Sequence, residues 1–156
     1  MDAVGTRTKK EGRRQLVLTH KVNQMLHNTI TWICRLIAAL IMLQTLFYKF
    51  AGAEESIEIF SRLGVEPWGR YFTGIAELIA SLMILVPRTS VYGALMAIGI
   101  MLGAIMSHIF VLGVEVGGDN GLLFVYACIV LLASCYMVIS GRQQFLRMFL
   151  KTNPSR

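Results

Sequence analysis

Three ionisable side chains interrupt the long apolar stretches of this sequence: Lys49, Glu77 and His108. If those stretches cross a bilayer, each charge at mid-membrane costs about 3 kcal/mol or more, so such residues are candidates for function. A desolvated carboxyl shifts towards its protonated form, a nearby cation reverses that shift, and imidazole titrates near neutral pH. Glu77 and His108 are therefore the candidate catalytic residues, with a role in moving protons.

Other polar residues are grouped with these three by helical spacing. At about 100° per residue, Arg70, Thr73 and Glu77 share one stripe of a helix, whereas Gln44 lies on a different stripe from Lys49. These side chains cannot all face inward equally. We expect a pocket made of Glu77, His108, Tyr48 and either Gln44 or Lys49, and the candidate ligand-binding residues are Gln44, Tyr48, Lys49, Arg70 and Thr73.

A lipid-soluble quinone suits such a pocket. It needs hydrogen-bond donors for its two carbonyl oxygens, a proton source on reduction, an aromatic wall and an opening to the bilayer. The competing interpretation is structural: Glu77 and Lys49 form an ion pair, and His108 makes a hydrogen bond between helices. A pathway for protons or small solutes is a third interpretation. The sequence shows no haem, metal or nucleotide site.

The elements that must position these residues are membrane helices. The chain has 156 residues, of which 55% are hydrophobic and 15% charged, too apolar a composition for an ordinary soluble domain. Crossing the hydrocarbon takes about 20 residues. Four runs qualify once Arg70 is allowed to extend its charge to the surface, and they cover about 29–50, 69–86, 91–114 and 122–140.

The distribution of charge predicts the orientation of these spans. Eleven of the 15 Lys and Arg residues lie before residue 29, in the link 87–90 or after residue 140, whereas segments 51–70 and 115–121 hold two. The positive-inside rule then places both termini in the cytoplasm. We predict an all-α membrane protein: a four-transmembrane-helix, up-down-up-down antiparallel bundle in the inner (cytoplasmic) membrane of a bacterium. The net charge of +6 is thus a topology signal, and nucleic acid is not an expected partner.

Outside this membrane domain, 29–140, lie two basic tails, 1–28 and 141–156. In the first, Leu18, Val22, Met25 and Leu26 recur at helical spacing. Two interpretations remain open: a basic helix lying on the cytoplasmic leaflet, or a solvated tail that helps to set topology. In the outer link, residues 53–64 predict a short amphipathic helix. Its apolar face carries Ala53, Ile57 and Phe60, and Gly64 follows its last turn.

Small residues indicate where membrane helices approach one another. Gly99, Gly103 and Ser107 recur every fourth residue, and we expect this ridge to face the interior. Cys34, Cys128 and Cys135 form no C-x-x-C motif and are interpreted as small apolar fillers.

Several segments together resemble the DoxX family of four-helix membrane proteins. They are Arg35-Leu36, Phe47-Tyr48-Lys49-Phe50, the run from Gly64 through Glu66-Pro67-Trp68-Gly69-Arg70 to Gly74, Glu77 and Leu78, and Gly103 to His108. The resemblance covers roughly 29–140. The Arg of the first span, the Lys at its outer end and the Gly-x-x-Glu of Gly74 to Glu77 are its more specific parts.

The resemblance implies a four-helix membrane fold and suggests a redox role. The family takes its name from a small subunit of an archaeal thiosulfate:quinone oxidoreductase, and other members are associated with redox defence or with assembly of membrane proteins. The leading expectation is a quinone-linked component that works with a membrane or peripheral redox partner. The alternative is a non-enzymatic scaffold or assembly factor that binds a protein or lipid. Both interpretations are compatible with a homo-oligomer.

Overall fold

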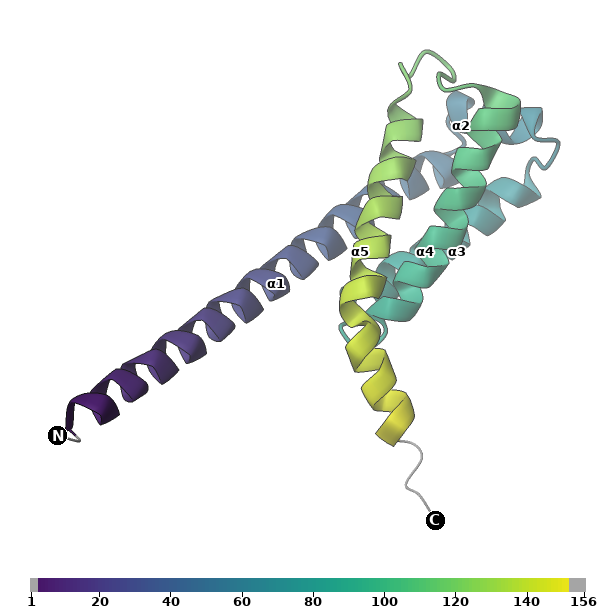
Figure 1. Ribbon diagram of the computed structural model, residues 1–156. Helices are drawn as coiled ribbons and strands as arrows, with labels where there is room; N and C mark the ends of the chain where they lie inside the picture. Colours follow the sequence, from purple (N-terminus) through teal and green to yellow (C-terminus); the bar gives the residue numbers. More distant parts are fainter. Residues whose placement is uncertain (1–2, 152–156) are drawn as a thin grey trace. The chain divides into compact units, whose positions relative to one another are not determined.

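The computed structural model describes the backbone of residues 3–151 and the side chains of residues 14–142 (Figure 1). Within that range every regular element is helical: α1 (Ala3–Ala51), α2 (Glu54–Arg62), α3 (Trp68–Leu85), α4 (Ser90–Ser107), a π-helical turn η1 (His108–Leu112) and α5 (Leu122–Lys151). The all-α class is confirmed. The chain divides between Ile33 and Cys34 into two units, which are described separately.

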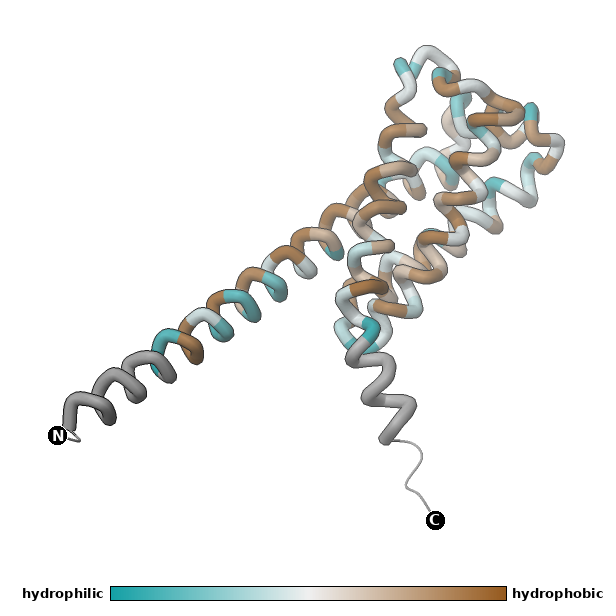
Figure 2. The backbone as a smooth tube through the Cα atoms, viewed as in Figure 1, coloured by the Kyte–Doolittle hydropathy of each residue, from teal (hydrophilic) through white to brown (hydrophobic). Residues whose placement is uncertain are grey.

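Three helical segments among the described residues are long and apolar enough to cross a membrane: Arg14–Ala51, Ser90–Leu112 and Leu122–Arg142. Figure 2 shows hydrophobic colours over much of α4 and α5. The second predicted span, 69–86, is helical but is not among these three, and it carries two charged residues, Arg70 and Glu77, within 18 residues.

The core of the second unit is built from small and flexible side chains on four helices. Its centre holds Ala38 and Met42 of α1, Ala80 and Ile84 of α3, Ala94, Ala97 and Met101 of α4, and Ala127, Val130, Ala133 and Met137 of α5. Helix α4 contacts both α3 and α5. Because these side chains are small, helix backbones come close together and dispersion contacts accumulate without long side chains between them.

The closest of these approaches is at Gly93 of α4, not at the predicted glycines. A Cβ atom at Gly93 would lie 2.7 Å from the backbone nitrogen of Ile84 and 2.8 Å from the carbonyl oxygen of Ala80. Gly99 and Gly103 are exposed, and a Cβ atom added at either would meet no atom within 4 Å. The prediction that Gly99, Gly103 and Ser107 face the interior was therefore wrong for both glycines, because α4 turns its Ser90, Gly93, Ala94 and Ala97 stripe inward instead.

The outer link between α1 and α3 contains the short helix that the sequence predicts, although it is a little shorter than 53–64. Glu54 and Glu55 in the first turn and Arg62 in the last suit the helix dipole. Gly64 ends it with φ +70°, and Gly64 and Val65 donate backbone hydrogen bonds to Ser61 and Phe60. This is a Schellman motif.

The inward face of α2 differs from the prediction in one respect. Phe60 is buried as expected, but the second buried residue is Ser56, whereas Ile57 is 38% exposed.

Candidate functional site

The centre of the candidate site is an ion pair between α1 and α3. The Nζ atom of Lys49 lies 2.5 Å from Oε1 of Glu77, and the two side chains are 16% and 5% exposed. Helix α1 supplies Lys49 from the stripe that also carries Ala38 and Met42 of the core. The structure thus brings Lys49 and Glu77 together, the arrangement that the structural interpretation of the sequence required.

Thr45 completes the environment of this pair, and it was not among the residues predicted from the sequence. Its hydroxyl lies 2.9 Å from the Met42 backbone carbonyl and 3.3 Å from Oε2 of Glu77, so its single proton is shared between these two acceptors. The signal was present, because Thr45 precedes Lys49 by four residues and shares its helix face. On α3, Ser81 donates a 2.7 Å hydrogen bond to the Glu77 backbone carbonyl, which keeps the Ser81 hydroxyl satisfied in the core.

Arg70 links this pair to the outer link. Its guanidinium pairs with Glu66 at 2.7 Å and lies 4.7 Å from the ring centroid of Tyr71. Its Nη1 also donates to the backbone carbonyl of Lys49. That carbonyl is one of those left without an intrahelical partner at the end of α1. Arg70 was predicted to bind a ligand, but it is buried and holds these protein groups.

The remaining predicted ligand-binding residues are Gln44, Tyr48 and Thr73. Gln44 and Tyr48 are exposed on another face of α1, and the Tyr48 ring packs edge-on against Phe47. The hydroxyl of Thr73 donates to the backbone carbonyls of Gly69 and Arg70. Of the two candidates for the first span, Gln44 or Lys49, the structure brings Lys49 to Glu77.

His108 belongs to a second cluster, where α4 ends. It is 5% exposed, its Nδ1 lies 2.8 Å from the carbonyl oxygen of Gly113, and its ring meets Phe124 at 5.7 Å between centroids. A neutral ring bonded in this way donates from Nδ1 and keeps Nε2 as an acceptor. The hydrogen bonds of Glu77 and His108 therefore go to different residues.

Asp119 anchors the loop that follows His108. Its carboxylate accepts backbone hydrogen bonds of 2.9–3.0 Å from Val116, Gly121 and Leu123, at the start of α5. Burial alone would raise the pKa of Asp119, but the hydrogen bonds from Leu123, Val116 and Gly121 and the nearby His108 outweigh it, so the pKa lies below its ordinary value.

At the other end of the bundle, Arg35 donates a 3.0 Å hydrogen bond to the hydroxyl of Ser90, the first residue of α4. Arg35 is 8% exposed, and this bond joins α1 to α4.

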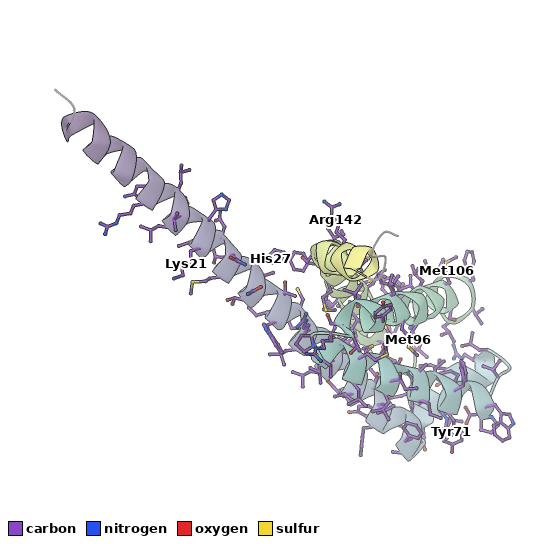
Figure 3. All side chains as sticks on the ribbon, turned by 90° about the horizontal axis from the view of Figure 1, so that it is seen from below. Lys21, His27, Tyr71, Met96, Met106 and Arg142 are labelled. Atoms are coloured by element: carbon purple, nitrogen blue, oxygen red, sulfur yellow. The ribbon has the colours of Figure 1, made fainter. Side chains whose placement is uncertain are left out.

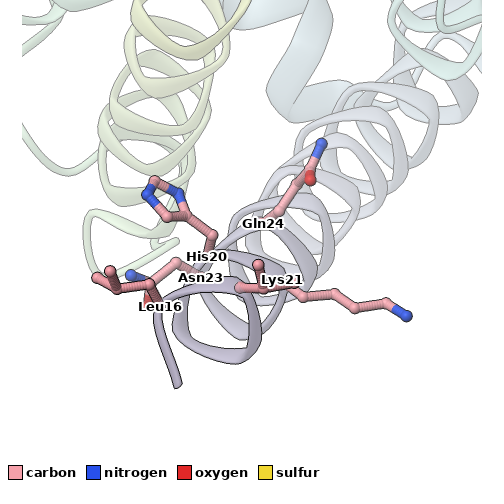
Figure 4. A pocket seen from close by; sticks show the side chains of 6 residues that line it. Leu16, His20, Lys21, Asn23 and Gln24 are labelled. Carbon is pink, nitrogen blue, oxygen red and sulfur yellow. The ribbon is translucent and has the colours of Figure 1, made fainter. Parts of the chain in front are cut away.

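Among the hollows on the described surface, two open ones are lined by neither Glu77 nor His108. One is on the helix of the first unit (Figure 4), and the other, where α3 begins, is lined by Gly64, Val65, Glu66, Trp68, Gly69 and Phe72. In the part of the chain with described side chains, no three His, Cys, Asp or Glu residues are placed to hold a metal ion. The three cysteines are half-buried free thiols.

These features define a class: a small all-α membrane protein with apolar helices and an internal Lys–Glu pair. The chain belongs to the DoxX-like family, whose family model matches residues 33–138. The match covers every residue of the ion-pair and His108 clusters. No curated protein and no solved structure matches the chain.

Proposed function

We propose that this DoxX-like protein is the membrane component of a quinone-linked oxidoreductase, with the Lys49–Glu77 pair as its proton-handling group. The observation that supports this proposal is the 2.5 Å contact between Lys49 and Glu77 at 16% and 5% exposure. A surface pair of this kind would contribute at most about 1 kcal/mol, whereas a buried one must offset a large desolvation cost. Apolar residues would hold the two helices together without this desolvation cost.

The proposal includes a fourth span, formed by α3. Its two charges lower its mean hydropathy, but Arg70 and Glu77 are 5% and 4% exposed and both are paired. The side chains that α3 exposes include Phe72, Ile75, Ile79 and Leu82, which suit lipid. With four spans both termini lie on one side, and the basic tails place that side in the bacterial cytoplasm.

The proposal assigns roles to residues at the pair and next to it in the sequence. The Lys49 ammonium, which now donates to Glu77, would donate to a quinone carbonyl oxygen, and the rings of Phe50 and Tyr71, with centroids 6.0 Å apart, would form an apolar wall. Reduction of one quinone to its quinol consumes two electrons and two protons. In this proposal a partner oxidoreductase supplies the electrons, and the Lys49–Glu77 pair passes each proton from the aqueous side to a quinone oxygen.

The test is quinone content and quinone binding of the protein purified in mild detergent. We expect quinone in the organic extract of the wild type, and binding of a short-chain quinone analogue that weakens at least about tenfold, or about 1.4 kcal/mol, in Glu77→Gln and Lys49→Met. Glu58→Gln is the matched control, because Glu58 also pairs at 2.5 Å, with Arg62, but on the surface. No quinone and no analogue binding in the wild type would overturn the proposal, as would equal binding in all variants.

A second candidate function is that of an assembly factor, favoured by the open hollow beside α2. Trp68 and Phe72, which line it, are 80% and 74% exposed. If a membrane protein client docks there, it should co-purify with the wild type and be lost in Trp68→Ser plus Phe72→Ser. Phe47→Ser, at a residue 72% exposed on α1, is the control and should keep the client. Retention of the client in the double variant would contradict this candidate.

A further inference from the structure

The helix of the first unit has an apolar row that is exposed among the residues with described side chains. Leu18, Val22, Met25 and Leu26 are 53%, 53%, 64% and 55% exposed. At about 100° per residue they fall within one third of the helix circumference. Apolar side chains in such a row, left in water, are an unpartnered helix face.

Basic side chains border this row. Arg14 precedes Leu18 by four residues and Lys21 precedes Met25 by four, so both lie along one edge of the row, and Figure 3 shows Lys21 projecting from the helix. The opposite side carries His20 and Gln24 together with the exposed Leu16 and Val17, and all four line the open hollow of Figure 4. Before residue 29 the sequence has six Lys and Arg residues against Asp2 and Glu11. The charge of this segment complements an anionic surface.

Two threonines lie shortly before the end of the first unit. Thr29 and Thr31 each turn their hydroxyl back onto the backbone, at 3.0 Å from the Met25 carbonyl and 2.8 Å from that of His27. Such bonds weaken and often bend a helix. The β-branched residues Thr29, Ile30, Thr31 and Ile33 follow one another closely and lower helix propensity further.

From these observations we propose that residues 14–28 form an interfacial helix that binds anionic phospholipids of the leaflet next to the first span. The row of Leu18, Val22, Met25 and Leu26 enters the acyl boundary, and Arg14 and Lys21 contact lipid phosphates. A bend at Thr29–Thr31 brings the helix onto the leaflet. Each basic residue near an anionic surface contributes about 1 kcal/mol, and the contribution falls with salt. This proposal is independent of the quinone proposal.

The experiment measures trypsin cleavage after Arg14 and Lys21 in the full chain, reconstituted as single copies in lipid nanodiscs. In discs containing phosphatidylglycerol, cleavage should be at least about fivefold slower than in discs of phosphatidylcholine alone, and high salt should remove most of the difference. Cleavage at equal rates in the two kinds of disc would overturn the proposal. Slow cleavage that appears only when two copies share a disc would overturn it in favour of pairing between copies.

Two valines on the same helix provide a matched comparison that leaves the trypsin sites intact. Val22 lies in the apolar row and is 53% exposed, whereas Val17 lies on the side opposite the row and is 65% exposed. Both changes to Ser have a similar effect on helix propensity. Val22→Ser should raise the cleavage rate about threefold in anionic discs, while Val17→Ser should leave it unchanged. Equal effects of the two substitutions would contradict insertion of the row.

Discussion

Arg70 donates a hydrogen bond to the backbone carbonyl of Lys49, so the first turn of α3 closes the last turn of α1. Because Arg70 also pairs with Glu66 and Lys49 pairs with Glu77, contacts run without a break from the outer link to the core. Arg70, 21 positions away in the sequence, therefore holds the backbone that carries the Lys49 ammonium group.

The buried pair leads to a prediction about stability. Lys49→Met or Glu77→Leu alone leaves one charge uncompensated, and each should lower the melting temperature in detergent by about 10 °C, corresponding to ~3 kcal/mol. The double variant should recover most of that loss, because no charge is left buried. Thermal unfolding followed by circular dichroism measures this. A double variant whose melting temperature falls by the sum of the two single decreases would contradict this prediction.

The glycines of α4 should respond in opposite ways to the same substitution. Gly93→Ala forces the new Cβ atom against the backbone of α3 and should destabilise the protein by about 1–3 kcal/mol. Gly103→Ala adds a methyl group in open space and should be neutral or stabilising by up to about 1 kcal/mol, since Ala favours the helix. Melting temperatures of the two variants decide the matter. Destabilisation by Gly103→Ala would mean that this face is covered.

Asp119 predicts a dependence of stability on pH. Its folded pKa is depressed, so its contribution is present above the unfolded pKa of about 3.9 and is lost as the pH falls through the lower folded value. Asp119→Asn should cost about 1 kcal/mol at pH 7, because the amide cannot accept the bonds of Leu123 and Val116 at once. The difference in unfolding free energy between the wild type and Asp119→Asn should narrow below about pH 4. A difference that stays constant between neutral and acidic pH would contradict this role of the Asp119 carboxylate.

If α3 crosses the membrane as proposed, it determines the sides on which the links lie. Alkaline phosphatase, which is active only outside the cytoplasm, should be active when fused after Gly118 and inactive when fused after Arg88. If α3 did not cross the membrane, Arg88 would lie on the same side as α2, and a fusion there would share the activity of one placed at Gly64. Enzyme activity in intact cells, normalised to the amount of fusion protein, distinguishes these outcomes.

Much of the fold followed from local sequence. The apolar runs predicted the helices, and Gly64 predicted the end of α2, because a left-handed residue there requires no long-range contact. The sequence also singled out Lys49, Glu77 and His108, since few ionisable groups occur in such runs; in the structure Glu77 and His108 are buried and the Lys49 side chain is 16% exposed.

The sequence by itself determined the helical class, the family and the residues at which charge enters an apolar environment. Only the tertiary structure decided which of them meet. Helix rotation about its own axis is fixed by packing against neighbours, so Thr45 and Lys49 turn towards Glu77 while Gln44 and Tyr48 face away. For the same reason Gly93, not Gly99 or Gly103, lies against α3, and Glu77 and His108 belong to separate clusters.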